Sequence, residues 1–207
     1  AVNALNDLLD GLFYKRSNAD KDKYWNESAG RLALGLCKLI LAVDEELSLR
    51  KLLDWKNGKL KDGTVRSCFE SLSSDNDIYQ NLSGYMNLTA ENTKTCIEST
   101  FDQLTGIFSS SKSLIDMMSE DSMELEDISL NKRAVFLVVP DEKTTYHFLV
   151  TLFIKQVYEL LLEKADQNKG CLPIRMNFIM EEFCNMPRLD DLAPMLTAAR
   201  SRNIRFH

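Results

Sequence analysis

Apolar residues recur at helical spacing along the first part of the chain and predict a set of amphipathic helices. The clearest apolar stripes lie over residues 25–41, 49–58, 78–86 and 96–108. An earlier stripe covers residues 2–13. In each stripe, large apolar side chains fall three and four positions apart, as on one face of a helix. Such stripes are usually core, so we expect residues up to about 127 to form one all-α unit.

The pattern changes at residue 133, where it becomes typical of strands. The run RAVFLVVPD, residues 133–141, is continuously apolar up to Pro140, which predicts a strand buried on both faces. A long amphipathic helix is expected over 144–166, and the turn NKGCLP leads from it to a second strand, IRMNFIM, at 174–180. Strand, crossover helix and strand form a βαβ unit, which requires a parallel pair. The predicted fold class is therefore mixed: an all-α domain followed by part of an α/β parallel-sheet domain.

Composition and charge narrow the possible classes of function. The chain has 207 residues and a net charge of −6, whereas nucleic-acid-binding modules usually carry a basic field. Its five cysteines form no CxxC pair, which indicates a reducing compartment and argues against a disulfide framework or a zinc site. The longest apolar stretch, residues 32–43, is too short to span a bilayer. The chain begins without methionine, and we expect it to be part of a longer protein.

Two adjacent carboxylates, Glu181 and Glu182, follow the second predicted strand directly. In open α/β sheets, ligands bind beyond the carboxyl ends of the strands. An apolar strand that ends in two acids is the Walker B pattern of nucleotide-hydrolysing motors. There the first acid holds Mg²⁺ through its water shell, and the second orients or deprotonates the attacking water. An ordinary strand that runs out into solvent would look the same, so the acids alone do not decide.

A longer stretch around these acids resembles a known family. FIMEEFCNMPRLDDLAPMLTAARSRNIRF, residues 178–206, resembles the Walker B region of conjugative type IV secretion coupling proteins, the TraG/TraD-like family. Their motif is a strand, Asp-Glu-Phe, a small residue, Asn, then Pro and a helix ending in Arg-Ser-Arg. KYWNESAGRLALGLCKLIL, residues 23–41, resembles the opening of the family's all-α domain, and residues 125–161 resemble its return into the motor. The resemblance is colinear over most of the chain.

The resemblance implies an architecture and a location. Family members are membrane-anchored, RecA-like ATPases that form hexamers. By this resemblance residues 1–20 are a helix at the motor edge, residues 21–127 the all-α cargo-recognition domain, and residues 128–207 a RecA-like α/β segment that carries Walker B. The implied location is the cytoplasmic face of the bacterial inner (plasma) membrane, with the anchor outside this chain.

The resemblance also implies partners and an activity. The helical domain would bind the relaxosome or a secreted protein cargo, and the motor would pass it to components of the secretion channel. Single-stranded DNA is expected as a partner only of the full-length hexamer, which would be a homo-oligomer. ATP and Mg²⁺ are the cofactors implied for the parent protein, and none is expected to be bound to this segment.

Five residues are candidates for the site. The resemblance implies that Glu181 holds Mg²⁺ and belongs to the nucleotide site, and that Glu182 is catalytic. Asn185 would hold the loop after Walker B by side-chain hydrogen bonds to the backbone. Arg200 and Arg202 could act in trans, because a guanidinium group stabilises the transition state of phosphoryl transfer. Charge placement at a helix C-terminus explains the two arginines at least as well.

Two departures from the family pattern qualify these expectations. Glu181 stands where the family has Asp, so the acid is one methylene longer. No G-x-x-x-x-G-K-[ST] motif occurs in the 207 residues, so we expect the phosphate-binding loop upstream of Ala1 and no ATP hydrolysis by this segment alone. Two alternatives stay open: another hexameric RecA-like DNA translocase, and a non-catalytic helical adaptor. The predicted βαβ unit with terminal acids counts against the adaptor.

Overall fold

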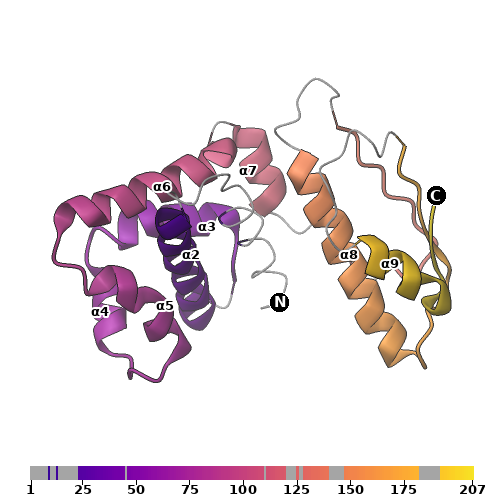
Figure 1. The fold of residues 1–207 in the computed structure, drawn as a ribbon, viewed down its shortest axis with the longest axis horizontal. Helices are drawn as coiled ribbons and strands as arrows, with labels where there is room; N and C mark the ends of the chain where they lie inside the picture. The colour runs from indigo at the N-terminus through magenta and orange to yellow at the C-terminus, as the bar shows by residue number, and fades with distance from the viewer. Residues whose placement is uncertain are drawn as a thin grey trace. The chain divides into compact units, whose positions relative to one another are not determined.

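The chain divides into two compact units, residues 1–121 and 122–207. The computed structural model describes residues 9, 13, 23–44, 46–109, 111–119, 125, 128–139, 147–181 and 192–207. Figure 1 shows helices in both units, and the second unit also contains two short strands. Among the described residues, no helix is long and apolar enough to cross a membrane.

The first unit is built around one long helix, α2. Its elements are α2 (Lys23–Asp44), α3 (Leu49–Asp54), the π-helix η2 (Trp55–Lys59), α4 (Thr64–Glu70), α5 (Asp77–Met86), α6 (Glu91–Ser109) and α7 (Lys112–Ser119). Helix α2 packs against α3, α5 and α6 (Figure 1). Leu32, Leu36 and Ile40 on α2 are fully buried, at the spacing of four that keeps them on one face. The predicted all-α character of this part of the chain is confirmed.

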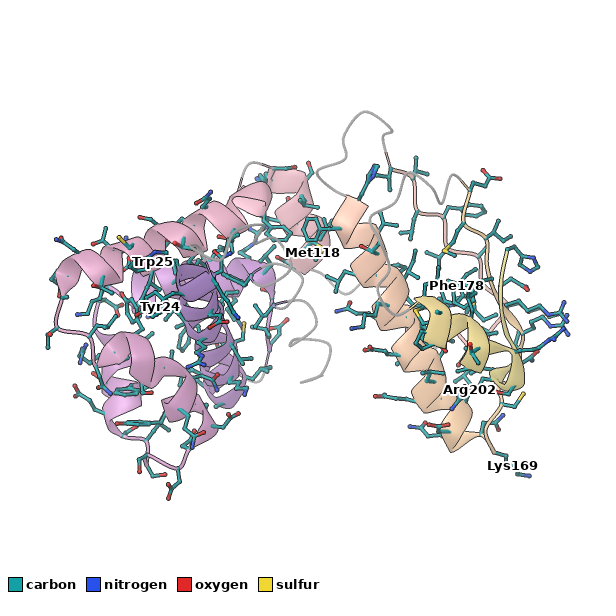
Figure 2. The ribbon with its side chains drawn as sticks, in the orientation of Figure 1. Tyr24, Trp25, Met118, Lys169, Phe178 and Arg202 are labelled. Atoms are coloured by element: carbon teal, nitrogen blue, oxygen red, sulfur yellow. The ribbon has the colours of Figure 1, made fainter. Side chains whose placement is uncertain are left out.

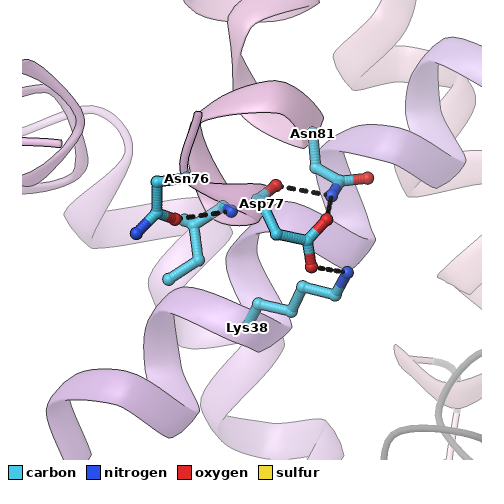
Figure 3. Close-up of polar contacts among 5 residues, drawn as sticks. Lys38, Asn76, Asp77 and Asn81 are labelled. Carbon is cyan, nitrogen blue, oxygen red and sulfur yellow. Dashed lines mark hydrogen bonds and ion pairs between the residues drawn. The ribbon is translucent and has the colours of Figure 1, made fainter. Parts of the chain in front are cut away.

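Helices α2 and α5 approach closely at Gly35. A Cβ atom placed on Gly35 would lie 2.6 Å from both Cγ and Cδ2 of Leu82, a fully buried side chain of α5. Beside this contact, the Lys38 ammonium pairs with Asp77 in the first turn of α5. Figure 3 shows this ion pair, together with Asn76, whose side chain caps α5 by accepting a hydrogen bond from the Ile78 amide at 2.8 Å.

A buried lysine joins η2 to α6. Lys56 is 1% exposed, and its ammonium group lies 2.5 Å from the Asp102 carboxylate. The same ammonium group lies 5.7 Å from the centre of the Phe101 ring. A buried charge is stable only when it is paired, and the carboxylate and the ring face both meet that need. The Phe13 ring packs 5.6 Å from Phe101, so residue 13 contributes to the core of this unit.

The second unit contains a two-stranded parallel sheet among its described residues. Its elements are α8 (His147–Gln167), β1 (Met176–Phe178), α9 (Leu192–Ala199), the 3-10 helix η6 (Arg200–Arg202) and β2 (Ile204–Phe206). Strand β1 pairs with β2 in the register Met176↔Ile204, Asn177↔Arg205 and Phe178↔Phe206. Helix α9 lies in the crossover between the strands, and it shares one buried cluster with α8 and Ile204 (Figure 1).

The prediction of a strand at 133–141 is wrong for residues 133–139, the part of this range that the structure describes. Residues 132–139 form no strand, and Phe136 and Val138 are 84% and 92% exposed. A β-branched run favours a pleated, half-buried surface, but it becomes a strand only beside a partner that shares its hydrogen bonds. The parallel partner of β1 is β2 instead. Pro140 and Asp141 lie outside the described residues, and the RecA-like assignment of this unit stays a prediction.

The contact at Gly35 generates a test with a matched control. We expect Gly35→Ala to lower the free energy of unfolding of the helical unit by ~1–2 kcal/mol, because displacing Leu82 outweighs the better helix propensity of alanine. Gly84 is exposed on α5 with no atom within 4 Å of an added Cβ, so Gly84→Ala should stabilise by ~0.5–1 kcal/mol. Both tryptophans, Trp25 and Trp55, lie in this unit, so urea unfolding followed by tryptophan fluorescence measures it. Equal effects of the two substitutions would contradict the close approach.

Candidate functional site

Glu181 lies just beyond the carboxyl end of a parallel strand. It comes three residues after Phe178, the last residue of β1, and its side chain is exposed. The Met180 amide donates a hydrogen bond of 3.1 Å to the His207 carbonyl, so the two chain segments stay paired up to the residue before Glu181. This is the position that the sequence predicts for the first acid. An exposed carboxylate here fits Mg²⁺, which keeps several waters and takes one or two carboxylates from the protein.

Two of the predicted site residues, Glu182 and Asn185, lie outside the described residues. Their predicted roles therefore stay predictions, as does the role of Glu181 in metal binding. Within the described ranges, no three His, Cys, Asp or Glu side chains gather into a group that could hold a metal ion.

The two candidate arginines differ in their surroundings. Arg202 is half-buried at the end of η6, which follows α9 (Figure 2), and its Nη1 donates a hydrogen bond of 3.4 Å to the carbonyl of Ala198. Its Nε is buried without a hydrogen-bond partner among the described atoms. This carbonyl contact matches the charge placement expected at a helix C-terminus. Arg200 is exposed, and no described residue forms an ion pair with it. Of the two, Arg200 is the more exposed.

Tyr158 fixes α9 on α8 and thereby places the arginines. Its hydroxyl donates a hydrogen bond of 3.2 Å to the Met195 carbonyl of α9, and its ring centre lies 6.0 Å from that of Phe206 on β2. Burial raises the pKa of Tyr158, and the nearby Arg202 cation acts against that rise. The hydroxyl therefore keeps its proton, and with it this hydrogen bond, at neutral pH.

Asn203 holds the start of β2 against the start of β1. Its φ is +64°, a left-handed conformation that asparagine adopts more readily than most residues. Its Nδ2 donates to the Leu172 carbonyl at 3.2 Å, and its Oδ1 accepts from Arg175 Nε at 3.3 Å. Its own carbonyl accepts from the Met176 amide at 3.1 Å. Asn203 was not among the residues predicted from the sequence, although an asparagine directly after a helix is a known signal for the left-handed position.

Asn203 can be tested by two substitutions that separate its backbone from its side chain. Asn203→Ala should destabilise the β1–β2 pairing more than Asn203→Gly by ~1 kcal/mol, because both lose the side-chain hydrogen bonds but only alanine is strained at positive φ. Hydrogen exchange at the Met176 and Met180 amides measures the pairing directly, since both amides donate across it. Slower exchange in the alanine variant than in the glycine variant would contradict this interpretation.

The chain matches the family model described as Type IV secretory system Conjugative DNA transfer over residues 5–207. No curated protein matches it, and no solved structure matches it. Because the family model covers nearly the whole chain, the protein belongs to the type IV secretory system conjugative DNA transfer family.

Proposed function

We propose that this chain is the cytoplasmic part of a coupling protein, an ATP-driven motor that recruits relaxase–DNA complexes or protein substrates to the secretion channel. Membership of the conjugative DNA transfer family supports a role in type IV secretion. The observation that carries the motor part of the proposal is the place of Glu181, directly beyond the carboxyl end of a parallel strand. Ligand sites of open α/β sheets form at that edge.

In this proposal the two acids have separate tasks. Glu181 holds Mg²⁺ through water, and Glu182 accepts a proton from the water that attacks the γ-phosphate. We propose that the two adjacent side chains point in different directions, so that one reaches the metal while the other faces the phosphate. ATP and Mg²⁺ belong to the full-length protein, which we propose to be a RecA-like homo-hexamer at the cytoplasmic face of the bacterial inner membrane.

The helical unit is proposed to recognise cargo. Its partners would be the relaxosome or a secreted protein, and the motor would deliver them to components of the secretion channel. The charges on its surface are mixed, and many are already paired within the unit, as Arg50 is with Asp116 and Lys38 with Asp77. DNA affinity depends on many unpaired cations that contact phosphates. Single-stranded DNA is therefore proposed as a partner of the full-length hexamer and not of this unit.

Substitution of Glu182 in the full-length protein tests the proposed catalysis. Glu182→Gln keeps the size of the side chain but removes the base, so ATP should still bind while hydrolysis falls by roughly 10²- to 10⁴-fold. Glu181→Asp is the matched control, because it keeps the charge and restores the acid found in the family, so hydrolysis should be retained. Steady-state ATPase assays and nucleotide-binding titrations measure both effects. Hydrolysis by Glu182→Gln at the parental rate would show that these acids are only the solvated end of a strand.

The chain of 207 residues by itself should not hydrolyse ATP. It contains no G-x-x-x-x-G-K-[ST] motif, and so it lacks the backbone cradle and lysine that bind the phosphates in this class of motor. A magnesium-dependent phosphate-release assay on the purified chain measures this. Turnover that disappears in Glu182→Gln would contradict the expectation, whereas turnover that survives this substitution would come from a contaminant.

A further inference from the structure

The β1–β2 sheet has one face built for a core. Met176 and Phe178 of β1 and Ile204 and Phe206 of β2 pack with the buried cluster of α8 and α9. The rings of Phe178 and Phe206 stack with centres 4.8 Å apart, and Figure 2 shows Phe178 beside α9. The residues of this face alternate with the other residues of both strands, because successive side chains of a strand point to opposite faces.

The intervening residues form a second face that is polar and exposed. Asn177 and Arg205 lie opposite each other in the register, and both are exposed. Arg175 and His207 are exposed as well, and the period of two puts them on the same side. We name these four residues the polar face. Parallel strands that are covered on both sides are apolar throughout, whereas these four positions are polar. Ile179, the next residue on this side of the chain, is apolar and 73% exposed, so the polar face ends there.

Two amides hold the Arg175 and His207 side chains of the polar face in place. Asn203 Oδ1 accepts from Arg175 Nε at 3.3 Å, and Asn177 Oδ1 lies 3.4 Å from Nε2 of His207. Among the described residues, no carboxylate forms an ion pair with Arg175, Arg205 or His207. Neutral partners orient these side chains without neutralising them. Less side-chain entropy is then lost when an anionic partner binds.

The polar face is cationic although the chain is acidic. The whole chain carries a net charge of −6, yet residues 192–207 contain three arginines and no acid. Neighbouring residues on one side of a strand are ~6.6 Å apart, and paired strands are ~4.8 Å apart. Arg175 and Arg205 therefore lie within reach of neighbouring carboxylates on one short peptide.

We propose that the polar face, Arg175, Asn177, Arg205 and His207, is a docking surface for a short acidic protein segment. Aspartate or glutamate carboxylates of the partner would accept paired hydrogen bonds from the two guanidinium groups, which suit a planar anion. This docking surface does not depend on the roles proposed for Glu181 and Glu182.

The extent of the polar face favours an acidic peptide over a nucleic acid. Proteins that bind single strands use a long cationic groove with aromatic platforms on which bases stack. The polar face has two arginines and one histidine, and the exposed Glu181 follows β1 at its end. A few carboxylates match the two guanidinium groups, whereas a polyphosphate chain would extend past them towards an acid.

The test uses fluorescence anisotropy of the 207-residue chain with labelled hexaglutamate at low salt. We expect weak binding that decreases as salt is added, because exposed charges are screened. Arg205→Gln, and the double variant Arg175→Gln with Arg205→Gln, should lower the affinity, by about tenfold for the double variant, equivalent to ~1.4 kcal/mol. The matched control is Lys59→Gln with Lys61→Gln, which removes the same charge from exposed side chains of the helical unit and should leave binding unchanged.

A charge reversal separates recognition from loss of folding. Arg175→Glu with Arg205→Glu should raise the affinity for labelled hexalysine more than Lys59→Glu with Lys61→Glu, which adds the same charge to the helical unit, while an unchanged far-ultraviolet circular dichroism spectrum shows that both variants are folded. Absence of hexaglutamate binding, or equal loss in the lysine control, would overturn the proposal. Tighter binding of hexathymidylate than of hexaglutamate, lost in the same arginine variants, would overturn it in favour of a nucleic acid.

Discussion

The helical unit depends on the burial of α2 on nearly all sides. Alanine, glycine and leucine alternate along this helix, and the small residues let its neighbours come close where the large ones fill the space between them. At Gly35 this approach is closest, because the Leu82 side chain occupies the volume that a Cβ atom would take. The ion pair of Lys38 with Asp77 and the cap at Asn76 then fix where α5 begins relative to that contact.

Two ionisable side chains of this unit, Lys56 and Cys37, are buried in its core. Lys56 is buried because Asp102 and the Phe101 ring both face its ammonium group. Cys37 on α2 is buried among apolar side chains, and this burial raises the pKa of its thiol to about 12. The thiol is therefore protonated and unreactive at neutral pH. Neither group has the exposure that a catalytic or binding residue needs, so both belong to the core.

In the second unit, a very short sheet determines where Glu181 lies. Only three residues of each strand are paired, and a sheet of this size needs packing from helices to be stable. Helices α8 and α9 supply this packing on one face of the sheet. There the Tyr158 ring of α8 lies beside the Phe206 ring of β2. Asn203 turns the chain from η6 into β2. The parallel direction of β2 then leaves Glu181 at the carboxyl edge, where the chemistry of the proposed motor requires an acid.

Local patterns determined the elements of this protein, and packing decided which of them pair. The stripes of apolar residues predicted α2, α5, α6 and α8 because the period of 3.6 is a property of the helix itself. The acid after the second strand was also predictable, since Glu181 directly follows an apolar run. The strand at 133–139 was predicted wrongly, because pairing depends on a partner that no local pattern contains. Only the tertiary structure showed β2 as the partner of β1, the different surroundings of Arg200 and Arg202, and the role of Asn203. The strand pairing and the contacts of Asn203 join residues that are distant in the chain, which no local pattern records.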